Sequence, residues 1–208
     1  MIALVDYGAG NLTSVRKALA AVGAGFFTPL TPSEIGGARG IVVPGVGHFD
    51  ATRALDSMWR ASILDAVQKG ASLLGICLGM QWLFEGSDEA PELPGLGLFA
   101  GTCVHLRSSN AQAAKSDAAQ FKVPHVGWNS VELPRDSGVM RGIGQGAQVY
   151  FTHSYVAPVG PEAAAVTRYG MAFASAVEGG RVAGVQFHPE KSGEVGLRIL
   201  ANWVATCA

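Results

Sequence analysis

Residues 75–79, Gly-Ile-Cys-Leu-Gly, constrain the fold of this 208-residue chain more than any other stretch. An apolar segment, 72–76, runs into Cys77, and glycine stands two positions before and after the cysteine. This spacing is typical of a nucleophile elbow, where a strand turns at once into a helix and larger side chains at the glycine positions would collide with the turn. The sequence therefore predicts a strand, a thiol exposed at its end and a helix directly after it.

The predicted elbow gives Cys77 the surroundings of a nucleophile. The positive end of the helix dipole favours thiolate over thiol, and the N–H of Leu78 would point to the place where a substrate oxyanion forms. A buried cysteine in an α/β core fits the same five residues. The motif alone favours the catalytic interpretation without excluding the structural one.

Short apolar strands and amphipathic helices alternate along the first half of the chain. Strands are expected at residues 2–5, 41–43 and 72–76, and helices at about 12–22, 49–69 and 80–85. The glycine-rich turn at 6–11 lacks the third glycine of a dinucleotide-binding motif, so no such site is assigned. This alternation predicts an α/β fold with a mainly parallel sheet flanked by helices, and functional residues at the carboxyl ends of its strands.

The second half of the chain reads as an antiparallel extension of this sheet. Strand-like segments lie at 99–106, 126–133 and 148–152, a hairpin turns at 178–181, and a last helix covers 195–204. Residues 108–120 are small and polar, which indicates a surface excursion without assigned chemistry. Because no linker or repeat is visible, residues 1–208 are expected to form a single domain.

Composition excludes several classes of function. Hydrophobic residues make up 49% of the chain, and 15 basic against 16 acidic residues give a net charge of −1 without a basic run, so nucleic acid is a poor candidate partner. The sequence shows no signal peptide and no apolar run of membrane-spanning length, so a cytoplasmic protein is expected. Three cysteines without a C-x-x-C pair argue against a disulfide framework and a cysteine-rich metal site, and no cofactor is expected.

His188, Pro189 and Glu190 follow the second strand of the predicted hairpin. Proline keeps the preceding residue extended, and residues two apart then emerge on the same side, where a carboxylate can select the tautomer of an imidazole and stabilise its charged form. The pair also fits two metal ligands or a solvated turn, although no third ligand stands at metal-site spacing. Together with Cys77 it supplies the thiol, base and orienting group of acyl transfer, provided that the three meet in space.

Six motifs together resemble a known family. They are Asp-Tyr-Gly-Ala-Gly-Asn-Leu at 6–12, Pro-Gly-Val-Gly-His-Phe at 44–49, the elbow at 75–81, Pro-His-Val-Gly-Trp-Asn at 124–129, Tyr-Phe-Thr-His-Ser-Tyr at 150–155 and Gln-Phe-His-Pro-Glu-Lys-Ser at 186–192. The elbow followed by His-Pro-Glu resembles the class I (triad) glutamine amidotransferases, which implies a flavodoxin-like fold. The remaining motifs are similar to the branch that serves imidazole glycerol phosphate synthase in histidine biosynthesis. The resemblance spans nearly the whole chain and departs from the pattern at Trp82 and in a longer excursion before Pro124.

The resemblance implies hydrolysis of L-glutamine to glutamate and ammonia through a thioester on Cys77, with His188 as base and Glu190 as its partner. It also implies a set of substrate-binding or oxyanion residues: Gly45, Val46, Gly47, Leu78, Gln81, His153, Ser154 and Tyr155. Judged without the resemblance, Gln81 fits a helix surface residue, and His153 and Tyr155 fit half-buried strand side chains. His48, His105 and His125 are taken as structural.

The resemblance implies a partner as well, the cyclase subunit of the synthase, a (β/α)8 barrel that forms a heterodimer with the glutaminase and receives its ammonia. The matching interface positions are Asn11, Trp128, Tyr150 and Lys191, although Trp128 and Tyr150 also fit a core and Lys191 a solvated charge. Alternatives are a glutaminase for another acceptor synthase, a stand-alone cysteine hydrolase such as a γ-glutamyl peptidase, and a catalytically silent binding protein on the same fold.

Overall fold

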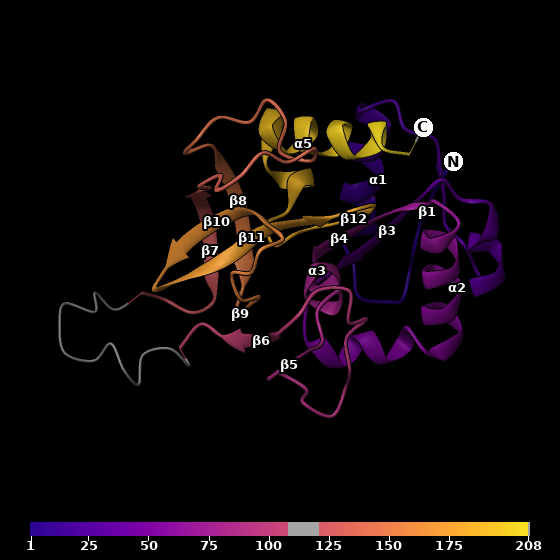
Figure 1. Cartoon of the computed structure of the whole chain (residues 1–208), viewed down its shortest axis with the longest axis horizontal. Helices are drawn as coiled ribbons and strands as arrows, with labels where there is room; N and C mark the ends of the chain where they lie inside the picture. Colours follow the sequence, from indigo (N-terminus) through magenta and orange to yellow (C-terminus); the bar gives the residue numbers. More distant parts are fainter. Residues whose placement is uncertain (108–120, 208) are drawn as a thin grey trace.

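A seven-stranded mixed sheet forms the centre of the molecule (Figure 1), of which the computed structural model describes residues 1–107 and 121–207. The expected excursion at 108–120 lies outside the described residues. The strands of the sheet are β1 (Ile2–Leu4), β2 (Phe26–Phe27), β3 (Gly40–Gly45), β4 (Ser72–Cys77), β10 (Ala163–Tyr169), β11 (Met171–Gly179) and β12 (Val182–Val185). Their spatial order is β10-β11-β12-β4-β3-β1-β2. The five strands from β12 to β2 are parallel, whereas β10, β11 and β12 pair antiparallel, which confirms the predicted fold class.

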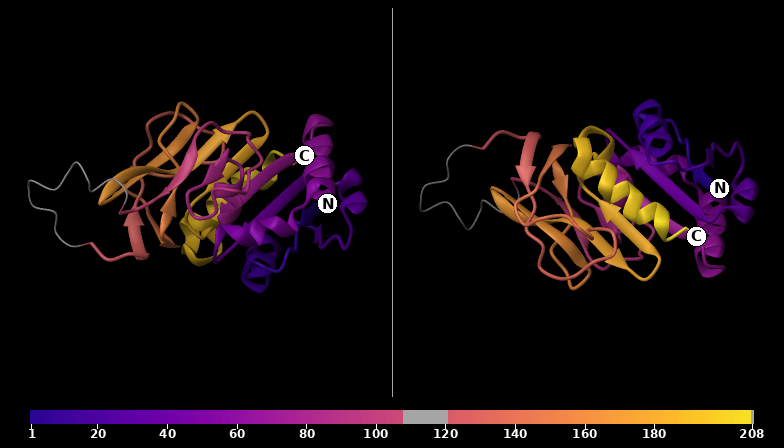
Figure 2. Two further views of the ribbon diagram at one scale, coloured as in Figure 1. Left: turned by 90° about the horizontal axis from the view of Figure 1, so that it is seen from below. Right: turned by 90° about the horizontal axis from the view of Figure 1, so that it is seen from above.

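Helices cover both faces of this sheet because its buried strands carry apolar side chains on both sides. Ile2 and Leu4 of β1 pack in one core cluster with α1 (Leu12–Ala21) and α5 (Gly193–Ala205). Ala3, between them, packs in a second cluster with α2 (Ser57–Gln68) and α3 (Leu78–Trp82). In the right-hand view of Figure 2, α5 lies in front of the strands. No helix of the described residues is long and apolar enough to cross a membrane.

The helix expected over residues 49–69 is interrupted, so that prediction is wrong in its first third. Residues Phe49–Ala54 form a 3-10 helix, η2, and α2 begins only at Ser57. Asp56 caps α2 by accepting hydrogen bonds from the N–H groups of Met58 and Trp59 at 2.9 and 3.1 Å. The apolar spacing continues through the break, and for this reason the pattern did not reveal it. A further 3-10 helix, η1 (Pro32–Gly37), precedes β3.

Two small sheets stand beside the carboxyl ends of the central strands. One contains β5 (Gly86–Ser87), β6 (Thr102–His105) and β9 (Tyr155–Val156), and the other pairs β7 (His125–Ser130) with β8 (Gln148–His153) antiparallel. The chain leaves β12 and passes β8, where the His188 N–H donates to the Tyr150 carbonyl at 2.9 Å before η3 (Pro189–Lys191). This contact brings the segment after β12 against β8 at the end of β4.

Candidate active site

Cys77 stands at the predicted elbow, as the last residue of β4 and directly before α3. Its φ of 55° makes it the one non-glycine residue with positive φ in the described part of the chain. A Cβ on Gly75 would lie 2.5 Å from the Gly79 carbonyl oxygen, and a Cβ on Gly79 would overlap the carbonyl of Val43. The two flanking glycines therefore permit the close packing that holds the cysteine in a sparsely populated conformation, as expected of a nucleophile elbow.

His188 and Glu190 form a buried pair beside Cys77. His188 Nδ1 lies 2.8 Å from Glu190 Oε1, and the two side chains are only 2% and 1% exposed. Because the Glu190 carboxylate oxygen can only accept, Nδ1 of His188 carries the hydrogen. Nε2 of His188 makes no hydrogen bond of standard geometry with the described residues. Burial by itself lowers the pKa of His188, but its interactions with Cys77 and then Glu190 outweigh burial and raise the pKa to about 9. The arrangement favours the imidazolium form of His188.

Gln186, which the sequence did not single out, connects Cys77 to the wall of the site. Its Nε2 lies 3.7 Å from Cys77 Sγ, and its Oε1 accepts from Gln81 Nε2 at 3.2 Å. Gln81 Nε2 also donates to the Tyr155 carbonyl at 2.9 Å. The Cys77 thiol lies 3.8 Å from the Thr152 carbonyl. Gln81 is thus a buried residue at 4% exposure and not the helix surface residue that its position suggested.

The Pro-Gly-Val-Gly turn lies next to the elbow because β3 and β4 pair with Gly45 opposite Cys77. A Cβ on Gly45 would strike the Tyr7 hydroxyl and lie 2.7 Å from Leu78 Cβ, so glycine is needed for close approach. Leu78 is the first residue of α3, and its N–H therefore has no intrahelical acceptor. The Val46 N–H, one of the two predicted oxyanion donors of the turn, donates to the Ala9 carbonyl at 2.8 Å in this structure. Gly47, at φ +95°, is the other predicted donor in the turn.

A cavity of about 280 Å³ opens over Cys77. It is lined by Gly47, Cys77, Leu78, Gln81, Glu89, Pro124, Thr152, His153, Ser154 and Tyr155. The cavity brings together most of the predicted substrate residues, whereas Gly45 and Val46 do not line it. Glu89, which the sequence did not indicate, is the one carboxylate among its described lining residues.

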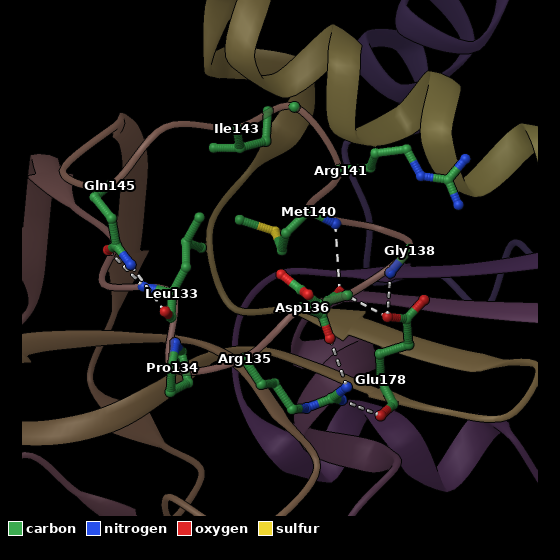
Figure 3. Close-up of a pocket in the computed structure, with 12 residues that line it drawn as sticks. Leu133, Pro134, Arg135, Asp136, Gly138, Met140, Arg141, Ile143, Gln145 and Glu178 are labelled. Atoms are coloured by element: carbon green, nitrogen blue, oxygen red, sulfur yellow. Dashed lines mark hydrogen bonds between the residues drawn. The ribbon is translucent and has the colours of Figure 1, made fainter.

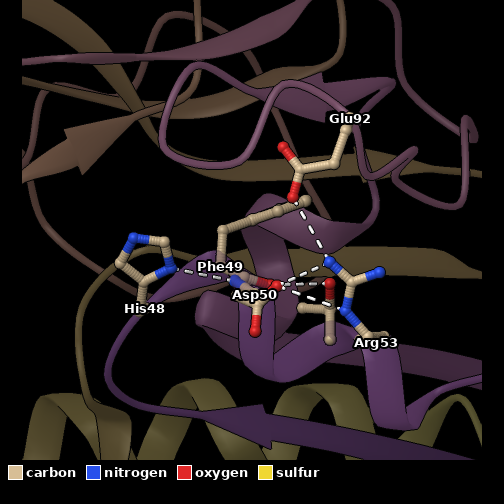
Figure 4. Close-up of polar contacts among 6 residues, drawn as sticks. His48, Phe49, Asp50, Arg53 and Glu92 are labelled. Atoms are coloured by element: carbon tan, nitrogen blue, oxygen red, sulfur yellow. Dashed lines mark hydrogen bonds and ion pairs between the residues drawn. The ribbon is translucent and has the colours of Figure 1, made fainter.

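Glu89 is positioned by the segment that follows the glycine turn. Its Oε2 accepts from the Phe49 N–H at 2.8 Å. In the same region His48 Nδ1 accepts from the Asp50 N–H and so caps η2, the structural role expected of this histidine (Figure 4). Arg53 bridges Asp50 and Glu92, at 2.8 and 3.3 Å, and thereby ties η2 to the loop that carries Glu89.

A larger hollow of about 850 Å³ lies away from this site, along the connection between β7 and β8 (Figure 3). Several of its polar groups are hydrogen-bonded within the protein: the Glu178 carboxylate accepts from Ser137 Oγ at 2.6 Å and the Gly138 N–H at 2.8 Å, and Arg135 donates to the Glu178 carbonyl. None of the predicted site residues lines it. Within the described residues no cluster of three potential metal ligands is found.

Three of the four predicted interface residues form one surface cluster. Trp128 on β7 is 56% exposed and faces Tyr150 of β8 across the strand pair, with ring centres 6.0 Å apart. Lys191 Nζ lies 5.8 Å from the centre of the Tyr150 ring. Trp128 is therefore not a core residue, and Tyr150 is half-buried. Asn11 is exposed and caps α1, accepting from the Ser14 N–H at 3.4 Å.

Comparisons with known proteins identify the family and the fold. The family model described as "Glutamine amidotransferase class-I" matches residues 3–207. The chain is 44% identical over 206 residues to "Imidazole glycerol phosphate synthase subunit HisH" of Deinococcus radiodurans, covering 97% of this chain and 92% of the relative. It is 45% identical over 209 residues to the protein of the same name from Thermococcus kodakarensis, covering 98% of both. A solved structure titled "Crystal structure of glutamine amidotransferase" shares the fold, with a TM-score of 0.74, 19% identity and coverage of 100% and 99%.

Proposed function

Since this chain belongs to the class I glutamine amidotransferases and, among them, to the HisH subunits of imidazole glycerol phosphate synthase, it is a glutaminase, and we propose that Cys77, His188 and Glu190 are its catalytic triad. Residues 1–208 then form one glutamine amidotransferase domain. The observation that carries the proposal is the buried His188–Glu190 pair, 2.8 Å apart, beside a cysteine held at positive φ.

The proposed reaction proceeds in two steps. Cys77 Sγ attacks the side-chain amide carbon of glutamine, His188 Nε2–H protonates the departing nitrogen, and ammonia leaves as the C–N bond breaks. A water molecule then gives its proton to His188 and attacks the thioester, which releases glutamate and restores the thiolate. Glu190 accepts from Nδ1 throughout, so it keeps Nε2 directed to the thiol and stabilises the imidazolium.

Each attack places a negative charge on the former carbonyl oxygen. The N–H of Leu78, at the start of α3, and the N–H of Gly47, in the turn beside it, are the proposed donors to this oxyanion. Donors fixed in the backbone are already oriented before the reaction, and this is the main source of oxyanion stabilisation.

The lining of the cavity fits an amino acid with a terminal amide. The Glu89 carboxylate supplies the negative charge that an α-ammonium group requires, and we assign it that role. Gln81 and the backbone of Ser154 and Tyr155 contribute amide and carbonyl groups along the same wall. Glutamine is thus held between Glu89 at one end and Cys77 at the other.

The partner proposed for this subunit is the cyclase of the synthase, a (β/α)8 barrel in a heterodimer. The relatives are named as subunits, and free ammonia in neutral water is mostly protonated and no longer nucleophilic, so a docked synthase must receive it in a dry route. Trp128, Tyr150 and Lys191, with Asn11, form the proposed docking surface because exposed aromatic side chains and neighbouring cations are typical of interface centres.

The test is ammonia release from glutamine, measured with the cyclase subunit present. Cys77→Ala should lower the rate by at least about a thousandfold, because alanine cannot carry the acyl group. Cys207→Ala, the same change at a cysteine outside the cavity, should retain activity, and thermal unfolding should show that both variants are folded. Release by Cys77→Ala at a rate close to that of the wild type would overturn the assignment.

A further inference from the structure

Two buried histidines to which the proposed reaction assigns no step form a hydrogen-bonded pair at the wall of the cavity, which His153 lines. The register of β7 and β8 places His125 opposite His153, and His125 Nδ1 lies 3.1 Å from His153 Nε2. His153 Nδ1 lies 3.1 Å from the Tyr155 carbonyl oxygen, and Asn129 Nδ2 lies 3.3 Å from His125 Nε2. The two imidazoles are only 2% and 7% exposed at the residue level.

The hydrogen bonds that connect Asn129, His125, His153 and the Tyr155 carbonyl can have only one donor-to-acceptor direction if both rings are neutral. A carbonyl oxygen only accepts, so His153 carries its hydrogen on Nδ1 and presents Nε2 as an acceptor. His125 must then donate from Nδ1 and accept at Nε2 from the Asn129 amide. The orientation of that amide is fixed independently, because Asn129 Oδ1 accepts from the Ser130 N–H at 2.8 Å and Nδ2 also donates to the Arg168 carbonyl at 3.2 Å.

The surroundings keep both rings uncharged. The His125 ring is stacked between Phe151 and Tyr169, with ring centres 4.7 and 3.9 Å away, and burial lowers the pKa of His125 to about 4. Burial, the neighbouring His125 and the charge of His188 lower the pKa of His153 to about 3, against the opposing effect of the Tyr155 carbonyl. Neutral rings spare the His188 imidazolium a repulsive neighbour.

One end of this series of hydrogen bonds lies in the substrate site. The Tyr155 carbonyl accepts both from His153 and from Gln81 Nε2, at 3.1 and 2.9 Å, and Gln81 continues through Gln186 to the Cys77 thiol. The other end is Asn129, which follows Trp128 of the proposed docking surface on β7. The contacts therefore join β7 to the wall of the cavity without a break.

We propose that Asn129 and His125 are positioning residues for glutamine hydrolysis, which act through His153 to fix the Tyr155 carbonyl, and with it Gln81, against the substrate. This relay is defined as Asn129, His125, His153 and the Tyr155 carbonyl. Its effect on hydrolysis rests on the proposed function of Cys77, but its hydrogen-bond direction does not.

The direction of the relay is measurable in the full chain by ¹⁵N NMR of the histidine side chains at pH 7, which distinguishes the two neutral tautomers and the imidazolium. We expect His125 and His153 both to be neutral with the hydrogen on Nδ1, the form that a free imidazole populates less. Detection of either ring as the Nε2–H tautomer or as imidazolium would overturn the relay. Asn129→Asp replaces the donor with an acceptor of the same shape, so His125 Nε2 should become protonated; an unprotonated Nε2 in this variant would also overturn it.

The functional effect is measured by steady-state kinetics with glutamine. His125→Phe keeps the aromatic stack but removes the donor to His153, and we expect KM for glutamine to rise roughly tenfold with a smaller change in kcat. The matched control is His105→Phe, the same change at a histidine that also contacts the Tyr155 ring but lies outside the relay; its KM should stay near that of the wild type. A folded His125→Phe with unchanged KM would refute the positioning role while leaving Cys77 as the nucleophile. If His125→Phe does not fold, the NMR measurement on the wild type still decides the relay.

Discussion

Cys77 holds a backbone conformation that only tight packing around it can impose. The φ of 55° is sparsely populated for a residue with a side chain. The absence of a Cβ atom at Gly75 lets α3 approach β4, and its absence at Gly79 lets α3 approach Val43 of β3, closely enough to maintain this conformation. The same geometry places the Leu78 N–H beside the thiol. A few residues within one turn therefore determine both the nucleophile and a donor to the oxyanion.

A first prediction separates the roles of His188 and Glu190. If Glu190 orients His188 and supports its charge, Glu190→Gln should slow ammonia release by about a hundredfold, whereas His188→Ala, which removes the base, should cost at least about tenfold more. Rates from single-turnover measurements with the cyclase present decide between them. Equal losses would mean that Glu190 acts more directly than as an orienting group.

A second prediction concerns stability at acid pH. The folded-state pKa of His125 is lowered from 6.5 to about 4, so the unfolded chain binds a proton that the folded chain excludes. The contribution of His125 to the free energy of unfolding is therefore fully present above pH 6.5 and is lost as the pH falls toward 4. Between pH 7 and 5 the wild type should lose about 1 to 2 kcal/mol more unfolding free energy than His125→Phe. Urea unfolding at both pH values provides the comparison; identical losses in the two proteins would contradict the buried neutral histidine.

Among the elements, the break between η2 and α2 shows how a capping side chain overrides an apolar pattern. The apolar spacing from residue 49 to 69 continues across it, yet Asp56 accepts from the N–H groups of Met58 and Trp59 and starts a new helix. Because η2 also carries the Phe49 N–H that binds Glu89, the interruption helps to place the loop at the substrate cavity.

A third prediction follows from this cap. Asp56→Ala should lower the free energy of unfolding by about 1 kcal/mol, the usual cost of removing an N-cap side chain, without changing ammonia release. Asp56→Asn is the matched control, since asparagine caps equally well. Chemical unfolding of the three proteins gives the values, and a stability unchanged in Asp56→Ala would show that the cap contributes nothing.

On the scale of the whole molecule, the site combines segments that differ in how far sequence alone reveals them. The elbow and the His188–Glu190 pair are defined by short-range patterns, so the type of fold and the end of the sheet that carries these residues were predictable. Glu89 and Gln186 were missed because their positions depend on loop paths and on contacts between distant strands. The engagement of the Val46 N–H by Ala9 likewise depends on how two loops meet.

A fourth prediction concerns the complete synthase. Trp128→Ala or Lys191→Ala should reduce the ratio of glutaminase activity with the cyclase and its ligand to activity without them, because both residues belong to the proposed docking surface. Met58→Ala, which removes another exposed hydrophobic side chain but on α2, is the control. Ammonia release with and without the cyclase gives the ratios, and the same ratio in all four proteins would place the docking surface elsewhere.

The most direct test of the account is where a glutamine-like electrophile, such as a chloroketone analogue, attaches to the folded chain. Cys77 lines the substrate cavity, whereas burial raises the pKa of Cys103 and of Cys207 and neither lines that cavity. Mass mapping after a single addition should therefore find the adduct on Cys77 alone, with protection by glutamine. An adduct on Cys103 or Cys207 with Cys77 unmodified would contradict the assignment of Cys77 as the nucleophile.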